Sequence, residues 1–284
     1  MINTKKKIIT VAVVLAILLI SASLGLFRED KGVTSPDIET VNELEGTTLG
    51  GVAARMPDNS AKILFESLLG VKLRNYQSYQ NTFETLSALR TNEIQAAWFP
   101  DVTVRYLLQM EEGFKEIPMP QNEKPRLDFA MALKSDNISL RDEINAAIAT
   151  LKENGMLEDL QDYYVTNAKS AMKFKPSDME QISDSNQTIY VGITGAVWPL
   201  DLVDIELNPY GFSVALMNEI GKLTHKKVKF VTLKNDTAFS SLMGGKVDLL
   251  FCYGTSQSTL SDTKNYIMTD GYYTMNQYSY LVLE

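Results

Sequence analysis

Two blocks of alternating strand and helix patterns, separated by a polar stretch, constrain the fold of this chain more than any other feature. In the first block, the β-rich run 47–54 precedes helical apolar spacing at Ile63, Leu64 and Leu68, and the alternation continues to a short helix at 156–164. The second block begins with a strand at 188–193 and alternates to a last strand at 278–283. Residues 166–187 between the blocks are rich in polar residues and read as a linker. Strands that alternate with helices predict mostly parallel sheets, so we expect an α/β protein with two lobes.

The pattern also places individual elements within these blocks. It predicts strands at 71–76, 94–99 and 127–133, and a helix marked by Phe83, Leu86 and Leu89. Ser139 is expected to cap a further helix, with Asp142 three residues on as in a capping box.

Composition and charge exclude several classes of function. The formal net charge is -8, and no basic cluster follows Lys5-Lys6-Lys7, so nucleic acid is not expected as a partner. The chain has one cysteine, Cys252, and one histidine, His225. We therefore expect no disulfide within the chain, no metal site and no cofactor. No paired-carboxylate, histidine or nucleophile arrangement indicates an enzyme.

The N-terminal residues have the pattern of an export segment. Three lysines precede the apolar run 8–27, and Arg28-Glu29-Asp30 follows it. The run is long enough to span a bilayer as a helix, and the charge pattern predicts that the remainder lies outside the cytoplasm. Ser21-Ala22-Ser23 also offers a cleavage site, so residues 1–27 are interpreted as a signal anchor or a cleaved signal peptide. Residues 28–43 form a spacer.

The second block resembles the first lobe of the family 3 extracellular solute-binding proteins, which are the polar amino-acid receptors of ABC importers. Five features carry the resemblance in the family's order: Ile189-Tyr190-Val191-Gly192, Trp198-Pro199, Gly211-Phe212, the stretch 242–248, and Asp270-Gly271-Tyr272-Tyr273. The first block is similar to the family's second lobe and C-terminal segment, from Leu44-Glu45-Gly46 to the helix stop at Asn154-Gly155.

In the family the first lobe comes first, whereas here it comes last. The resemblance therefore implies a two-lobed periplasmic-binding-protein-like (type II) fold in circularly permuted order. Residues 44–127 would form the family's second lobe, 128–165 would pack on its first lobe, 166–187 would be the linker, and 188–284 would form the first lobe. In this interpretation one covalent strand, near 127–131, crosses between the lobes, and the strand 278–284 ends free or pairs beside it. A remnant of a tandem receptor is the alternative.

The resemblance also implies candidate ligand contacts in the cleft between the lobes. Trp198 stands where family members place an aromatic side chain against the ligand, and Thr255 matches a threonine that binds the ligand's amino group. Ser256 and Gln257 add hydrogen-bonding groups, although a plain turn has the same sequence. Asp101 falls near the family's amine-binding aspartate, and a helix cap is the alternative.

A second group concerns a carboxylate on the ligand. Arg55 ends the strand 47–54 beside the helix start that contains Ser60, and an arginine there can grip a carboxylate together with free N–H groups; a solvated arginine is the alternative. Where the family has a carboxylate-binding arginine, this chain has Leu260, and Lys264 is the nearest cation. This departure leaves an ordinary amino acid in doubt as the ligand.

The sequence thus predicts an extracytoplasmic receptor, anchored to the cell membrane or secreted, that binds a small polar, amino-acid-like solute for an ABC permease. A membrane-anchored sensory ectodomain with a sensory partner is the alternative, and a periplasmic enzyme of the same fold is the third.

Overall fold

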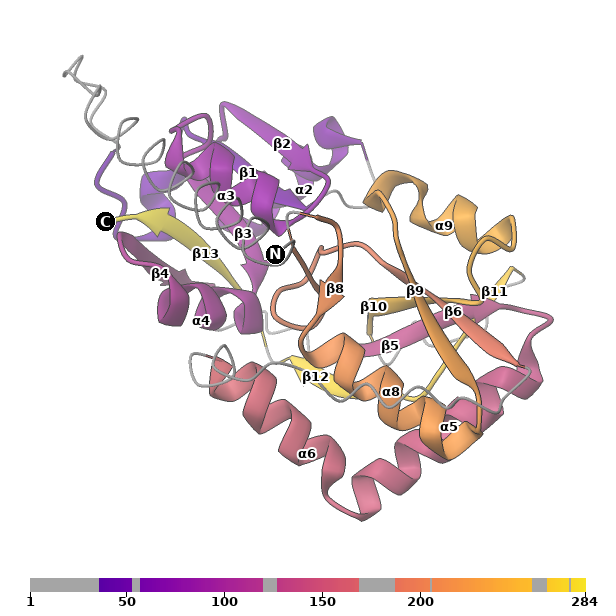
Figure 1. The fold of residues 1–284 in the computed structure, drawn as a ribbon. Coiled ribbons are helices and arrows are strands. Elements are labelled where there is room, and N and C mark those ends of the chain that lie inside the picture. The colour runs from indigo at the N-terminus through magenta and orange to yellow at the C-terminus, as the bar shows by residue number, and fades with distance from the viewer. Residues whose placement is uncertain are drawn as a thin grey trace, which may run out of the picture. The chain divides into compact units, whose positions relative to one another are not determined.

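The computed structural model describes residues 36–52, 57–119, 127–168, 187–204, 206–256, 265–275 and 277–284, and for residues 127 and 252–256 the description is limited to the backbone. The described helices and strands lie in the unit Asp37–Glu284, while the unit Met1–Pro36 contributes Pro36 alone to the described residues. Two sheets organise the larger unit (Figure 1), and each forms the centre of a lobe.

Lobe A is built on a five-stranded sheet with the order β2-β1-β3-β13-β4. Its strands are β1 (Thr48–Val52), β2 (Asn75–Tyr79), β3 (Ala96–Pro100), β4 (Phe114–Pro118) and β13 (Tyr278–Leu283). Its helices are the 3-10 helix η1 (Val41–Leu44), α2 (Asp58–Leu69), α3 (Thr82–Arg90) and α4 (Asp101–Met110). The strands β1, β2 and β3 run parallel, and β13 runs antiparallel to β3 and β4.

Lobe B is built on a sheet with the order β11-β5-β10-β6-β9, and β12 also pairs with β5. Its strands are β5 (Leu127–Lys134), β6 (Thr188–Ile193), β9 (Lys227–Thr232), β10 (Leu249–Ser256), β11 (Tyr266–Met268) and β12 (Tyr273–Met275). Its helices are α5 (Ile138–Glu153), α6 (Met156–Gln161), the π-helix η2 (Asp162–Thr166), α8 (Phe212–Thr224) and α9 (Asn235–Met243). A small hairpin of β7 (Leu202–Val203) and β8 (Pro209–Tyr210) lies between β6 and α8.

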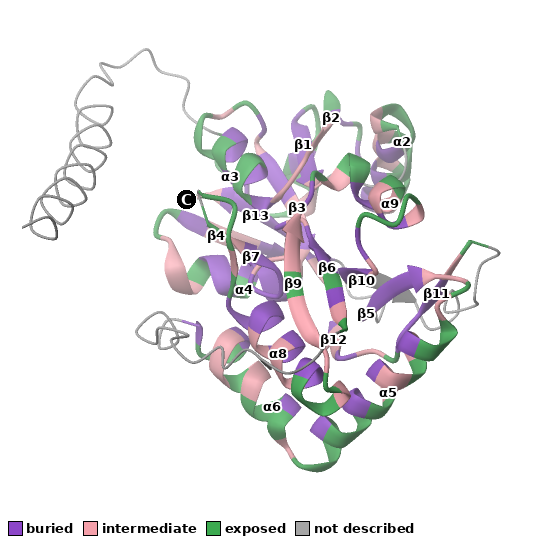
Figure 2. Ribbon diagram, turned by 45° about the vertical axis from the view of Figure 1, so that its right-hand side comes forward, coloured by how far each residue is buried: buried purple, intermediate pink, exposed green. Residues whose placement is uncertain are grey.

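The fold is therefore α/β with two lobes, as the alternating pattern predicts. Each lobe buries its sheet against one face of its helices: in α8, Phe212, Leu216 and Ile220 recur at helical spacing and are fully buried. Figure 2 shows buried residues along β5 and β10, whereas α5 alternates buried and exposed residues. The two cores also meet, because Val102 of α4 packs in the core of lobe B and Leu202 of β7 packs in a cluster of lobe A.

The last strand differs from the expectation. The sequence places 278–284 in the lobe that begins at residue 188 and predicts that this strand ends free or pairs beside 127–131. In the structure β13 lies between β3 and β4, where both of its edges are hydrogen-bonded and Tyr280, Leu281 and Val282 are buried in lobe A. The chain consequently passes between the two sheets both from β4 to β5 and from β12 to β13, rather than through one crossing strand.

Smaller corrections concern element ends. Ser139 does not cap α5, because the helix already begins at Ile138 with Asn137 as its N-cap, and Asp142 pairs with Arg141 instead. The strand expected at 71–76 begins later, at Asn75, since Val71 and Leu73 are buried in the connection that follows Gly70.

Within the described part of the chain, no helix has both the length and the apolar character needed to cross a membrane. The run 8–27 lies outside the described residues.

Candidate functional site

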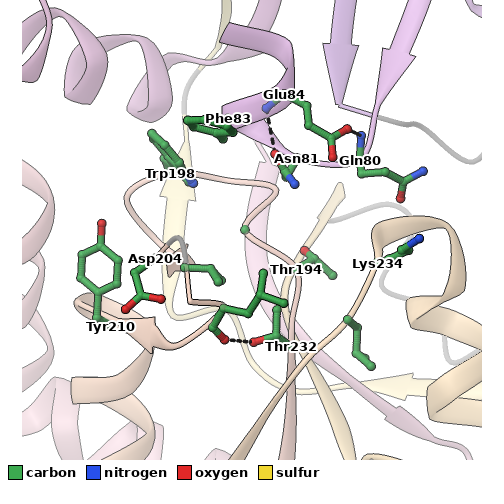
Figure 3. A pocket seen from close by; sticks show the side chains of 14 residues that line it. Gln80, Asn81, Phe83, Glu84, Thr194, Trp198, Asp204, Tyr210, Thr232 and Lys234 are labelled. Atoms are coloured by element: carbon green, nitrogen blue, oxygen red, sulfur yellow. Dashed lines mark hydrogen bonds between the residues drawn. The ribbon is translucent and has the colours of Figure 1, made fainter. Parts of the chain in front are cut away.

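A pocket of about 730 Å³ lies between the two lobes, and side chains of both line it. Lobe A contributes residues at the start of α3: Gln80, Asn81, Phe83 and Glu84. Lobe B contributes Thr194, Gly195, Trp198, Val203, Asp204, Leu207, Tyr210, Thr232, Leu233 and Lys234. Figure 3 shows the lobe A group facing the loops that follow β6 and β9. Because β2, β6 and β9 all end at this pocket, it occupies the strand-end position where α/β proteins commonly hold ligands.

The wall from lobe A is a helix start whose polar groups are used locally. The side chain of Asn81 accepts a hydrogen bond from the backbone N–H of Glu84 at 2.9 Å. The carboxylate of Glu84 in turn accepts the N–H of Gln80 at 3.0 Å. These reciprocal bonds fix the first turn of α3 and leave the ring of Phe83 59% exposed in the pocket.

The loop after β6 is held by the fully buried carboxylate of Asp201. It accepts hydrogen bonds from the N–H groups of Val197 at 2.7 Å and Ala196 at 3.1 Å, and from the hydroxyl of Thr194 at 3.2 Å. Burial raises the pKa of Asp201 to about 6, although these donors act in the opposite direction. Asp201 therefore determines the shape of the loop that carries Trp198 into the pocket.

A second turn, at the tip of the β7–β8 hairpin, closes the pocket on the lobe B side. Asp204 accepts the N–H groups of Glu206 at 2.9 Å and Asn208 at 2.8 Å, and these bonds hold the pKa of Asp204 below its usual value. The hydroxyl of Thr232 donates to the carbonyl of Leu207 at 2.6 Å and ties the hairpin tip to β9.

Direct hydrogen bonds join the lobes beside the pocket. The N–H and hydroxyl of Thr82 donate to the carbonyls of Gly195 at 3.2 Å and Ala196 at 2.9 Å, and the hydroxyl of Thr103 donates to the carbonyl of Trp198 at 2.6 Å. The amide of Gln80 exchanges two longer bonds, of 3.2 and 3.3 Å, with Asp236. The loop after β6 is thus the main contact of lobe B with α3 and α4 of lobe A.

Comparison with family models gives one match, in which residues 189–283 fit the bacterial extracellular solute-binding proteins, family 3. This segment of the chain is therefore similar to the family 3 solute-binding proteins. The segment runs from β6 to β13, so it includes the strands of lobe B that end at the pocket and the strand that enters lobe A. A comparison with curated proteins found no match.

Solved structures give weak likenesses. The ancestral amino acid-binding protein AncCDT-1, a precursor of cyclohexadienyl dehydratase, is 13% identical over 84% of this chain and 82% of its own, with a TM-score of 0.42. A mutant of arginine-bound ArgBP from T. maritima is 13% identical over 86% and 92%, also at 0.42. The BvgS periplasmic domain of B. pertussis is 11% identical over 84% and 37%, at 0.39. All three TM-scores are below 0.5, so the fold is described from the observed order of the strands and not from these likenesses.

Of the predicted contacts within the family 3 segment, Trp198 lines the pocket. Its ring is half-buried and meets Tyr106 of α4 edge-on, with 6.2 Å between ring centroids. Thr255 and Ser256 end β10, where their backbones pair with Asp128 and Leu127 of β5. Their side chains, and all of Gln257, lie outside the described residues, so their ligand contacts stay predictions.

Of the predicted contacts in lobe A, Ser60 and Asp101 are not among the lining residues of the pocket. Ser60 is exposed in the first turn of α2, and Arg55 lies outside the described residues. Asp101 begins α4, whose N-cap is Pro100, so it is a first-turn residue rather than the cap. One oxygen of Asp101 lies 3.3 Å from Arg105, and the other is buried without a hydrogen-bond partner among the described residues. Burial raises the pKa of Asp101.

Sequence reasoning missed most of the pocket's apolar lining. Phe83 fits the helical spacing of its segment, and this spacing does not indicate a pocket. Leu207 and Tyr210 lie in a hairpin too short to give a strand pattern. One feature of the sequence could have indicated this lining: Tyr210 is a large aromatic residue directly before Gly211, where a helix begins.

Proposed function

We propose that the chain is a solute-binding protein that captures a small ligand between its two lobes and does not transform it. The observation that carries this proposal is the pocket of about 730 Å³ whose lining comes from both lobes. Its volume falls within the range of 300–1,000 Å³ typical of small-molecule sites. A ligand there touches α3 of lobe A and the loops of lobe B together, so it stabilises the closed arrangement over an open one.

We propose that the protein does not transform its ligand because the carboxylates at the pocket hold the protein's own loops and turns. In the described part of the pocket, Asp204 accepts N–H bonds from its own turn and Glu84 caps its own helix. Asp201 is fully buried, and its oxygens hold the loop after β6. Each carboxylate therefore has a structural task, and none is left poised beside a nucleophile.

The finer role that we propose is delivery of the solute to an ABC permease from the extracytoplasmic side. The family 3 match at residues 189–283 supports this, because that family consists of extracellular solute-binding proteins. The apolar run 8–27 would anchor the receptor to the cell membrane, with residues 28–284 outside.

A sensory ectodomain is the second candidate, and one sequence departure favours it. Leu260 occupies the place where the family resemblance implies a carboxylate-binding arginine. A receptor without that arginine need not serve amino-acid import. In this case closure of the lobes would be reported to a sensory partner.

A ligand screen tests the proposal directly. Amino acids, amines, carboxylates and short peptides are added to the full chain in detergent, and the midpoint of thermal unfolding is measured. A ligand at 100 times its Kd stabilises the protein by about 2.7 kcal/mol, which gives a clear upward shift. If no compound shifts the midpoint, capture is contradicted, and if the hit is consumed on incubation, the protein is an enzyme.

Uptake separates the two candidate roles. Loss of the protein should abolish cellular uptake of the labelled hit if it serves a permease. Unchanged uptake with an altered cellular response to the hit would favour the sensory role.

A further inference from the structure

Three exposed apolar side chains from different elements line the interlobe pocket. Phe83 at the start of α3 is 59% exposed, Leu207 at the hairpin tip 65%, and Tyr210 of β8 41%. Trp198 and Val203, which are both half-buried, line the same pocket and extend its apolar surface. Large apolar side chains gathered in one exposed hollow mark binding surfaces, because isolated exposed ones occur anywhere but clusters are rare.

Leu207 has an unusual backbone. Its φ is +65°, in the left-handed region that Gly and Asn adopt readily and leucine does not. The other non-glycine residues with positive φ in the described part of the chain are Asn92 and His225, which follow helix ends and belong to residue types that tolerate it. Leucine at this position therefore carries strain that its neighbours must hold.

The surrounding hydrogen bonds supply that hold. The N–H of Leu207 donates to the carbonyl of Asp204 at 3.0 Å, and the hydroxyl of Thr232 donates to the carbonyl of Leu207 at 2.6 Å. The carboxylate of Asp204 fixes the turn on either side through Glu206 and Asn208. The turn thus holds an apolar side chain in the pocket at a conformational cost, a form of strain that clusters at functional sites.

The polar groups of the same pocket are largely occupied by protein partners. Asn81 and Glu84 cap α3, Asp204 holds its turn, and the hydroxyl of Thr232 is used on Leu207. The surface left for a ligand is mainly apolar and aromatic, whereas the family resemblance implies a polar solute.

We propose that the pocket binds a solute with an apolar body the size of an aromatic ring, and that Leu207 is a specificity-determining contact to that body. This inference rests on the proposed solute-binding function and names its ligand class. The closed pocket removes the apolar body from water against Phe83, Leu207 and Trp198, which is the main source of affinity.

Substitutions at Leu207 separate ligand contact from structural support. Leu207→Asn keeps a side chain of similar shape, and Leu207→Gly removes it, and both residue types suit a φ of +65° better than leucine does. Both variants should therefore unfold at or above the wild-type temperature. The matched control is Ile63→Asn on α2, since Ile63 is 68% exposed and does not line the pocket.

The binding test uses two pairs of probes that share a head group. Phenylalanine is compared with glutamine, and 3-phenylpropionate with succinamate, by calorimetric titration of the full chain. In at least one pair, the apolar-bodied member should bind at least about tenfold more tightly than its polar-bodied partner. Leu207→Asn and Leu207→Gly should reduce that affinity about tenfold, whereas Ile63→Asn should leave it unchanged.

The outcomes distinguish this inference from the function beneath it. Equal or tighter binding of the polar-bodied probes, no binding of any of the four, or unchanged affinity in both Leu207 variants overturns the inference. The solute-binding function survives those results as long as the wider screen yields a ligand. It fails together with the inference only if neither these probes nor the screen gives binding.

Discussion

At the scale of single residues, the buried carboxylate of Asp201 determines how the pocket is built. Three donors from the loop after β6 converge on it, and that loop both carries Trp198 and makes the contacts with lobe A. Burial outweighs these donors and raises the pKa of Asp201 to about 6. The carboxyl group that holds this loop therefore titrates in a mildly acidic pH range.

The raised pKa predicts that Asp201 destabilises the folded protein as the pH rises. The unfolded carboxyl titrates near pH 4, so between about pH 4 and pH 6 the folded state binds more protons than the unfolded state. The contribution of Asp201 to the free energy of unfolding should fall by about 3 kcal/mol between these pH values and stay constant at higher pH. Urea unfolding of the wild type and of Asp201→Asn at several pH values measures it.

The comparison between the two proteins isolates this residue from the other carboxylates. Asp201→Asn should be less stable at every pH, because an amide places donors where the loop N–H groups need an acceptor. The stability difference between wild type and variant should shrink from pH 4 to pH 6. A difference that grows or stays constant would contradict a raised pKa.

Trp198 is predicted to matter for both binding and stability. Its ring lines the pocket and also packs with Tyr106 in a cluster of lobe A. Trp198→Ala should therefore weaken binding of the screen's hit by roughly ten- to hundred-fold and lower the unfolding midpoint. Calorimetric titration and thermal unfolding measure the two effects. Unchanged affinity would move the ligand away from this wall.

Prediction from sequence reached Trp198 but not the apolar residues beside it, for a physical reason. A sequence period reports which side chains share a face, and Phe83 does share a face with the buried Leu86 and Leu89. The period does not show which residues on that face lie in the core and which line a pocket between the lobes. The strain at Leu207 is even less visible, because it depends on the hydrogen bonds that Leu207 donates to the carbonyl of Asp204 and accepts from the hydroxyl of Thr232.

At the scale of elements, long periodic segments were predicted well and short ones were not. The strands 188–193 and 278–283 match β6 and β13 in their bounds, and α8 spans the predicted apolar positions. By contrast, β4, β7, β8, β11 and β12 were not predicted. The strands β7, β8, β11 and β12 have two or three residues, too few for an alternating pattern. The strands β4, β11 and β12 pair with strands that are distant in sequence.

A hydrogen bond from α4 of lobe A to the loop after β6 is predicted to stabilise the closed arrangement of the lobes. Thr103 is fully buried in α4 and donates to the carbonyl of Trp198 across the lobes. Thr103→Val keeps the shape of the side chain and removes this bond, which is worth about 1 kcal/mol. The closed state should lose roughly fivefold in population relative to the open one, and ligand affinity should fall accordingly.

Calorimetry and small-angle scattering measure these two quantities. Thr150→Val is the matched control, since the hydroxyl of Thr150 donates to Ala146 within α5 and does not reach lobe A. If both substitutions change affinity equally, the effect does not arise from the bond between the lobes.

At the scale of the whole molecule, the two ends of the larger unit lie near the same strand. Lys115 of β4 pairs with Asp37 at 2.9 Å and contacts Glu39. The same Lys115 is the register partner of Val282 in β13, and the N–H of Glu284 donates to Gly113 at 3.1 Å. Residues 37–39 and the last residues of the chain therefore both adjoin the beginning of β4.

This proximity suggests how the order of the lobes can be tested. A chain that runs through residues 187–284, a short Gly-Ser linker and residues 37–168 has the lobe order that the family resemblance implies. The linker spans a short gap at the edge of lobe A, and the new ends fall in 169–186, the segment that we interpret as a linker. Both passages between the sheets, from β4 to β5 and from β12 to β13, stay covalent.

We expect the rearranged chain to fold with a stability within about 1–2 kcal/mol of residues 37–284 in their natural order. Loop closure changes only slowly with loop length, and each strand keeps its neighbours in both sheets. Circular dichroism and urea unfolding measure the fold and its stability, and titration with the screen's hit tests whether the pocket survives. Breaking the chain instead at Gly70, between α2 and β2 within lobe A, is the control, and it should be more damaging because Gly70 connects two packed elements. A rearranged chain that stays unfolded while the Gly70 break is tolerated would contradict a circular permutation and favour the tandem-receptor remnant.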